Sequence, residues 1–121
     1  TKVNKNKIQI LFTPHLIPMF RGILSTIYIN YKNGLSAKKI YNFLKHYHRN
    51  NIFVKLDKFN KPIGTGDVMN TNLCKISVCE VRKKNCIIIF SAIDNLMKGA
   101  AGQAVQNMNV IYGFKEGEGL K

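Results

Sequence analysis

The apolar positions between residues 97 and 112 recur every three or four residues, which is the spacing of one face of an α-helix. They are Met97, Ala101, Ala104, Val105, Met108, Ile111 and Tyr112. Asp94 or Asn95 is placed to cap the first amides of this helix, and Gly113 is placed to end it. Gly99 and Gly102 lie in its first turns, where a glycine costs up to about 1 kcal/mol relative to alanine. We therefore expect another element, or a ligand at the helix N-terminus, to approach that backbone closely.

The rest of the chain alternates strand-like and helix-like patterns. They predict, in order, a strand at 8–12, an irregular proline loop at 13–18, a strand at 23–31, a helix at 37–49 capped by Ser36, a strand at 52–56 and a hairpin of strands 74–82 and 86–93. The second hairpin strand is apolar at nearly every position, which indicates that both of its faces are covered. This order predicts an α+β fold, in which helices pack on one face of a mostly antiparallel or mixed sheet.

The length of 121 residues and the hydrophobic fraction of 45% are those of one soluble domain. The longest apolar run, residues 86–90, is too short to cross a membrane. No apolar segment with a cleavage site follows the basic residues 1–7. We therefore expect a cytoplasmic protein without a membrane partner.

Cysteine and histidine spacing gives no sign of a metal site. Cys74, Cys79 and Cys86 lack a Cys-x-x-Cys pair and lie in predicted strands, which favours buried, reduced thiols. His46 and His48 are two residues apart on a predicted helix, so their side chains point away from each other. No metal ligand is predicted.

The formal net charge of +13 is what a nucleic-acid-binding protein often shows. Here the lysines are spread along the whole chain, which is also rich in asparagine and isoleucine. This distribution favours solvated lysine faces over a nucleic-acid surface. A small basic nucleic-acid-binding module is the alternative function outside the enzymes.

Two blocks carry a resemblance to a known family. Residues 12–24 read FTPHLIPMFRGIL, and residues 93–107 read IDNLMKGAAGQAVQN. Together they resemble the C-terminal part of N-acetyl-gamma-glutamyl-phosphate reductases, which are enzymes of arginine biosynthesis. The resemblance extends over essentially the whole chain, but the chain corresponds only to the C-terminal part of a family member. The sequence therefore looks like a fragment of a longer protein.

The resemblance implies a reaction whose central groups lie outside this sequence. Such a reductase attacks an acyl phosphate with a cysteine in a Gly-Cys-Tyr-Pro-Thr context, and NADPH on a Rossmann-type N-terminal domain then supplies hydride. Neither that motif nor the family's His-Arg-His segment occurs here. None of the three cysteines has a matching context, so no catalytic residue is expected in this chain.

The resemblance also divides the chain into two parts. Residues 1–94 would form part of the substrate and oligomerisation domain, and residues 95–121 a C-terminal helix and tail that return to the absent Rossmann-type domain. Because the last helix borders the nicotinamide in such enzymes, Asn95, Lys98 and Gly99 are expected near the cofactor, NADPH. Without that domain, we expect this helix to be underpacked on one face.

The loop 13–21 is the candidate border of the acyl-phosphate pocket. His15 and Arg21 would offer donors to anionic oxygens there, with a purely structural loop as the alternative. Homo-oligomerisation through the sheet is expected. The nearest alternatives are sister acyl-phosphate reductases that form aspartate semialdehyde or aminoadipate semialdehyde, because the residues that select the substrate are not all present.

Overall fold

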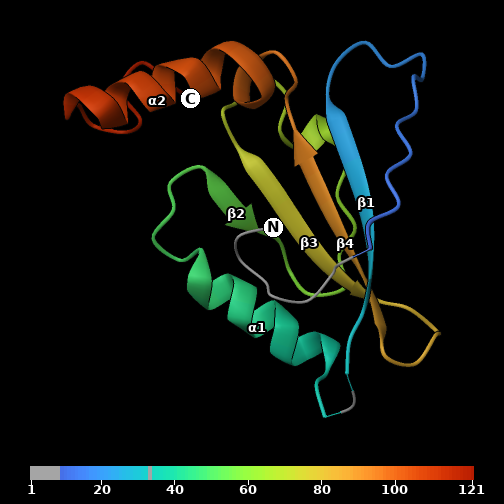
Figure 1. The fold of residues 1–121 in the computed structure, drawn as a ribbon. Coiled ribbons are helices and arrows are strands. Elements are labelled where there is room, and N and C mark those ends of the chain that lie inside the picture. The colour runs from blue at the N-terminus through green and yellow to red at the C-terminus, as the bar shows by residue number, and fades with distance from the viewer. Residues whose placement is uncertain (1–8, 33) are drawn as a thin grey trace.

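The computed structural model describes residues 9–32 and 34–121, and these residues form an α+β fold around a four-stranded sheet (Figure 1). The strands are β1 (Ile23–Asn30), β2 (Val54–Leu56), β3 (Cys74–Glu80) and β4 (Cys86–Ile93). Their order across the sheet is β1-β4-β3-β2. Strand β4 is antiparallel to β1 and β3, whereas β2 is parallel to β3. The sheet is therefore mixed, as the sequence predicts.

Helix α1 (Ala37–Tyr47) covers one face of the sheet (Figure 1). The Ser36 hydroxyl accepts a hydrogen bond from a first-turn amide at 3.2 Å, which confirms the predicted N-cap. Ala37 and Tyr41 on the apolar face of α1 are buried in one core cluster with Ile87 of β4. This cluster anchors the helix to the middle of the sheet.

The loop between β2 and β3, which contains the short helix η1 (Thr65–Asp67), covers part of the opposite face. Its Ile63 and Val68 side chains are buried against Ala92 of β4. Ile87 and Ala92 are both 0% exposed, and their odd separation places them on opposite faces of the strand. The prediction that β4 is covered on both faces is confirmed at these positions.

Strand β1 is an edge strand that pairs only with β4 in the described structure. All eight of its residues are exposed, although most of them are apolar or aromatic. The large exposed side chains are Ile23, Leu24, Ile27, Tyr28 and Ile29. An edge strand of this composition is suited to contact with another protein surface.

The chain leaves β4 through a wide π-helical turn, η2 (Met97–Ala101), and continues as α2 (Gly102–Tyr112), which extends beyond the end of the sheet (Figure 1). Gly113 ends α2 in the left-handed conformation with φ of 74°, as predicted. Much of the predicted apolar face of this helix is exposed, including Ala101, Ala104, Met108, Ile111 and Tyr112. The expected underpacked face is therefore present.

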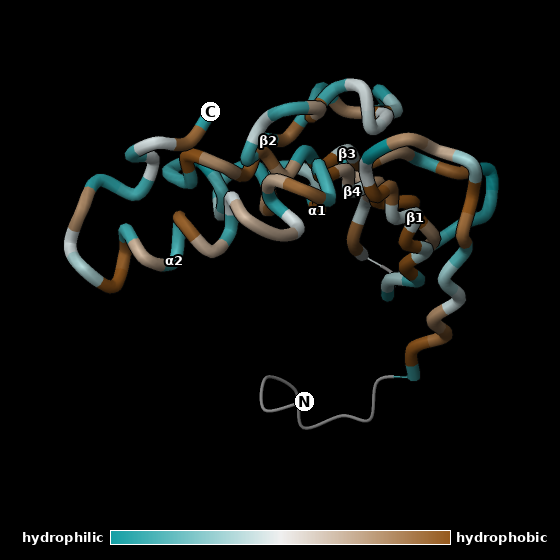
Figure 2. Tube along the Cα trace, turned by 90° about the horizontal axis from the view of Figure 1, so that it is seen from above, coloured by the Kyte–Doolittle hydropathy of each residue, from teal (hydrophilic) through white to brown (hydrophobic). Residues whose placement is uncertain are grey.

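The predicted strand at 8–12 is wrong over its described part. Residues 9–12 are irregular and exposed, and residue 8 lies outside the described residues. Figure 2 shows the apolar segment that follows the undescribed N-terminal residues standing away from the sheet. Alternating apolar residues form a strand only where a neighbouring strand pairs with them, and this segment has no such neighbour in the described structure. The predicted strand at 52–56 is shortened to β2 for the same reason, since only residues 54–56 pair with β3.

None of the helices in the described ranges is long and apolar enough to span a membrane.

Candidate functional site

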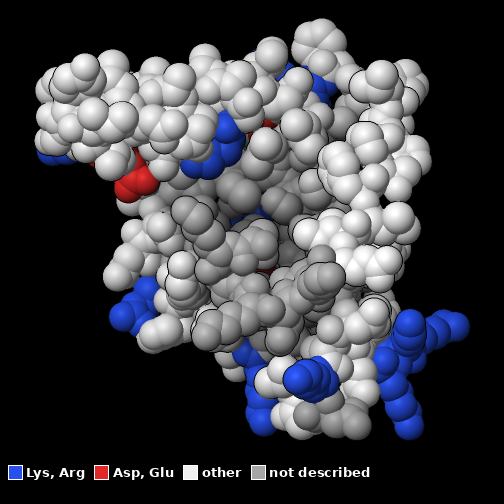
Figure 3. Space-filling model, in the orientation of Figure 1, with Lys and Arg blue, Asp and Glu red and all other residues white. Residues whose placement is uncertain are grey.

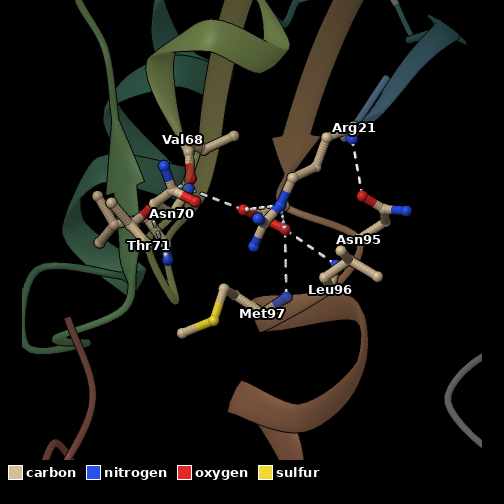
Figure 4. A network of polar contacts seen from close by, with 10 residues as sticks. Arg21, Val68, Asn70, Thr71, Asn95, Leu96 and Met97 are labelled. Atoms are coloured by element: carbon tan, nitrogen blue, oxygen red, sulfur yellow. Dashed lines mark hydrogen bonds and ion pairs between the residues drawn. The ribbon is translucent and has the colours of Figure 1, made fainter. Parts of the chain in front are cut away.

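The two sequence blocks, which are about seventy residues apart along the chain, meet at one end of the sheet (Figure 4). Ile23 at the start of β1 pairs with Ile93 at the end of β4, so the residues just before β1 lie beside the residues just after β4. Arg21 donates from Nε to the Asp94 carboxylate at 2.8 Å. The Gly22 amide donates to Asn95 Oδ1, also at 2.8 Å. The fold thus brings together two of the predicted site residues, Arg21 and Asn95.

Asp94 is the centre of this contact and is only 1% exposed. Besides Arg21, its carboxylate accepts hydrogen bonds from the backbone amides of Asn70 at 2.7 Å, Leu96 at 2.9 Å and Met97 at 3.2 Å. We call these five residues the Asp94 cluster. The amide contacts to Leu96 and Met97 confirm that Asp94 caps the turn after β4.

The Asp94 carboxylate stays ionised in spite of its burial. Burial raises its pKa, but the Arg21 guanidinium and the amides of Asn70, Leu96 and Met97 oppose this effect and hold the pKa at about 2. The hydrogen bonds and the contact with the Arg21 cation thus keep the pKa of Asp94 well below the usual value of 3.8. The cluster therefore contains a paired charge at neutral pH.

Gly22 fixes the loop that carries Arg21. Its φ of 111° lies in a region that favours glycine, and a β-carbon at this position would lie only 2.6 Å from the Thr65 side chain. The Gly22 amide is held by Asn95. The conformation of Gly22 and its hydrogen bond to Asn95 therefore hold Arg21 close to Asp94.

The turn η2 presents small residues to the outside. Gly99, Ala100 and Ala101 are all exposed. The backbone breaks from helical geometry at Ala100, where φ is −148° and ψ is −108°. Because no bulky side chain covers this turn in the described structure, another surface or a ligand can approach its backbone closely.

The two glycines of this region have different structural settings. A β-carbon at Gly102 would collide with Asn72 Oδ1 and lie 2.8 Å from the Met97 carbonyl oxygen, so packing inside this chain requires glycine there. A β-carbon at Gly99 would make only ordinary contacts, 3.4 Å to Ile93 and 3.5 Å to the Asp94 carbonyl oxygen. Packing within the described residues therefore accounts for Gly102 and leaves Gly99 without such a reason.

Lys98 points into a polar network beneath α2. Its Nζ donates to Gln106 Oε1 at 2.6 Å and lies 5.6 Å from the centre of the Phe53 ring. Burial lowers the pKa of the Lys98 ammonium, and the neighbouring Cys74 and Glu116 partly offset this effect. In this arrangement the Lys98 side chain is half-buried and bonded to Gln106 of α2.

His15 is not brought into the Asp94 cluster. It is exposed in the irregular loop before β1, and no hydrogen bond joins it to the cluster within the described structure. The described contacts of this loop come near its end, where the Met19 sulfur accepts a hydrogen bond from Thr65 Oγ1 at 3.5 Å. The candidate pocket border thus consists of a fixed end at Arg21 and an exposed stretch around His15.

Basic side chains do not form a continuous stripe on the face shown in Figure 3. Several separate groups lie toward the end of the molecule that carries α1 and the β3–β4 turn, and others lie beside α2 and at the opposite end. This distribution agrees with the spread of lysines along the sequence.

Comparison with known proteins decides the family. Residues 1–95 match the family described as semialdehyde dehydrogenase, dimerisation domain. The chain belongs to the semialdehyde dehydrogenase dimerisation-domain family. This match covers all strands of the sheet and ends within the Asp94 cluster.

Individual curated proteins match most of the chain. An N-acetyl-gamma-glutamyl-phosphate reductase of Thermoanaerobacter pseudethanolicus is 42% identical over 120 residues, which are 99% of this chain and 35% of that protein. The reductase of that name from Clostridium botulinum strain Eklund 17B is 44% identical over 120 residues, with the same coverage. One from Neisseria meningitidis is 43% identical over 110 residues, or 91% of this chain and 31% of that protein. The chain spans about a third of the length of these curated relatives, and the resemblance seen in its two sequence blocks is confirmed.

Sequence reasoning missed Asn70 and Asn72 in this semialdehyde dehydrogenase domain. Asn70 contributes a backbone amide from a turn with φ of 61°, and Asn72 is 0% exposed beneath α2. Asn72 donates to Gln106 at 2.9 Å, while its Oδ1 has no hydrogen-bond partner among the described residues. The available signal was the polar run 70–72 between apolar segments, which reads equally well as an exposed loop.

Proposed function

We propose that this chain is the C-terminal part of an NADPH-dependent N-acetyl-gamma-glutamyl-phosphate reductase, a cytoplasmic enzyme that forms N-acetylglutamate semialdehyde in arginine biosynthesis. The observation that carries the proposal is the identity of 42–44% to reductases of this name over 99% of the chain. The meeting of the two diagnostic blocks at the Asp94 cluster supports it, because residues far apart in the sequence then form one border.

The cofactor side of this border is the turn η2. Its exposed Gly99, Ala100 and Ala101 fit a group that must come close to the backbone, and the packing within this chain does not account for glycine at position 99. We place Asn95, Lys98 and Gly99 beside the nicotinamide, with Asn95 held by the Gly22 amide. NADPH would supply the hydride that reduces the acyl group. The phosphates of the cofactor would be held by the Rossmann-type domain, since the described residues offer no glycine-rich phosphate loop.

The substrate side is the end of the loop before β1. Asp94 engages Nε of Arg21, which leaves the terminal guanidinium nitrogens to face an anionic oxygen. His15 lies farther along the same loop and would offer a second donor once the loop is covered. In this proposal the chain contributes walls and donors to the site, while the attacking thiolate comes from the preceding part of the enzyme.

In this proposal, strand β1 and the apolar face of α2 each contact a different partner. The exposed edge strand β1 would contact a second copy of the chain, in keeping with the dimerisation-domain family. The apolar face of α2 would pack on the cofactor domain of the same polypeptide, with residues 1–94 and 95–121 as the two parts. Both contacts would cover apolar side chains that the described chain leaves in solvent.

Substrate selection tests the proposal directly. The complete polypeptide is assayed for NADPH oxidation with N-acetyl-gamma-glutamyl phosphate, with aspartyl phosphate and with the aminoadipyl analogue. We expect efficient reduction of the first acyl phosphate only. Preference for either of the other two would assign the chain to a sister reductase, and absence of reduction of all three would overturn the proposal.

A further inference from the structure

The Asp94 cluster lies between the edge strand β1 and the turn η2. On one side Arg21 and Gly22 lead directly into β1. On the other side Leu96 and Met97 begin η2. The cluster is therefore placed to fix the position of the turn relative to the sheet.

Asp94 itself connects three separate segments. Its carboxylate accepts from the side chain before β1, from the loop at Asn70 and from the first amides of η2 (Figure 4). The carboxylate is 0% exposed, so water does not replace a donor that is lost. Each of the three segments then depends on the same two oxygen atoms for its place at this end of the sheet.

The turn that Asp94 holds is otherwise open on its outer side. Gly99, Ala100 and Ala101 are exposed, and the backbone departs from helical geometry at Ala100. Residues 99–101 contribute little side-chain packing, so the position of the turn depends on the Lys98 bond to Gln106 and on the hydrogen bonds at its base. At the base of the turn, the amides of Leu96 and Met97 donate hydrogen bonds to the Asp94 carboxylate. The Gly99 amide donates a further one to the Asp94 carbonyl oxygen at 3.0 Å.

We propose that Asp94 is a positioning residue for cofactor binding, which holds η2 in the place where its exposed backbone meets the nicotinamide end of NADPH. The proposal rests on the proposed function and deepens it, since Asp94 is buried and does not itself touch the cofactor. A small displacement of η2 relative to the sheet would weaken the proposed contact of Gly99 with the cofactor. The fold of the sheet itself would be retained.

Asp94→Asn in the complete polypeptide is the sharpest test. The amide keeps the size of the side chain, but a single oxygen remains to accept from the amides of Asn70, Leu96 and Met97, and the NH₂ group must face at least one of these donors. Asp94→Ala is the second variant, because it removes both side-chain oxygens, including the one that accepts from the η2 amides. Either variant that folds provides the measurement.

Asp57→Asn is the matched control. Asp57 follows β2 at the opposite edge of the sheet, where it pairs with Lys61 at 3.1 Å and with Lys75 at 3.0 Å. Its pKa is also lowered to about 2, first by the Lys58 amide and then by Lys75. This substitution removes a comparable charge without touching η2.

Two readouts separate positioning from general stability. One is the dissociation constant for NADPH, and the other is amide hydrogen exchange of residues 96–101 in the cofactor-free protein. We expect the Asp94 variants to weaken NADPH binding about tenfold and to accelerate exchange selectively in this turn, whereas Asp57→Asn does neither. Equal NADPH affinity in the Asp94 variants and in Asp57→Asn would overturn the proposal.

The proposed function can fail separately. If the unaltered polypeptide reduces none of the acyl phosphates but binds NADPH, the reductase assignment falls while the binding and exchange measurements still decide the role of Asp94. If exchange rises throughout the chain instead of in η2, Asp94 is structural and the positioning role is excluded.

Discussion

Asp94 makes the folded chain sensitive to acid at the scale of a single residue. Its pKa is about 2 in the fold, compared with an ordinary value of 3.8. Because the folded pKa is lower, the unfolded chain takes up the proton first, so the stabilisation is present above about pH 4 and is lost as the pH falls toward 2. We expect the denaturant midpoint to fall between about pH 5 and about pH 3, and to fall less in Asp94→Asn. An unchanged acid dependence in that variant would contradict this account of the cluster.

The residue types in the sequence predicted some members of the Asp94 cluster but not the contacts between them. Asp94 was recognisable as a cap because a carboxylate before a helical pattern commonly serves amides there. Arg21 was recognisable as an anion donor, but the sequence does not show that Asp94 engages its Nε. Asn70 takes part through its backbone amide, and a backbone amide has no signature in the sequence. Whether Arg21 and His15 also contact substrate stays a prediction.

Substitution of Gly99 in η2 and of Gly102 in α2 tests how this helical segment is packed. We expect Gly102→Ala to destabilise the protein by about 1–3 kcal/mol, because its β-carbon meets Asn72 and the Met97 carbonyl group. Gly99→Ala should be neutral or stabilising by up to about 1 kcal/mol, since alanine is the better helix former and the space is sufficient. Thermal unfolding measures both effects. Gly99→Ala should nevertheless weaken NADPH binding, and unchanged affinity would remove Gly99 from the cofactor border.

The edge strand β1 allows a second test at this scale. Ile27 is 44% exposed on this strand, and Ile27→Lys would place a charge in the proposed contact between two copies. We expect the variant to dissociate into single chains, as measured by sedimentation. Phe43→Lys is the control, because Phe43 is 66% exposed on α1 away from β1. Loss of assembly in the control alone would place the contact on α1 instead.

The predicted helices and strands agree with the structure where capping residues, alternation and apolar runs all indicate the same element. The helix at 37–49 and the strands at 23–31, 74–82 and 86–93 were predicted because caps, alternation and apolar runs all point the same way. The strand at 8–12 failed because alternation alone does not supply a pairing partner. The π-helical form of η2 was not predictable, since it depends on how Asp94 receives the amides that follow it.

The whole molecule has two apolar surfaces that its own packing leaves open. One is β1, and the other is the outer face of α2 with Met108, Ile111 and Tyr112. Isolated domains of this size rarely expose so much apolar surface without a partner. Membership of a dimerisation-domain family agrees with the first surface, and the coverage of about a third of each relative agrees with the second. The division at residues 94 and 95 stays a prediction.

Reductase activity with N-acetyl-gamma-glutamyl phosphate tests the central claim most directly. NADPH oxidation is measured for the complete polypeptide and for residues 1–121 alone under the same conditions. The account predicts activity in the complete polypeptide and none in the 121 residues, because the proposal assigns the attacking thiolate and the cofactor domain to other parts of the polypeptide. NADPH-dependent reduction by the 121 residues alone, or its absence from the complete polypeptide, would contradict the account.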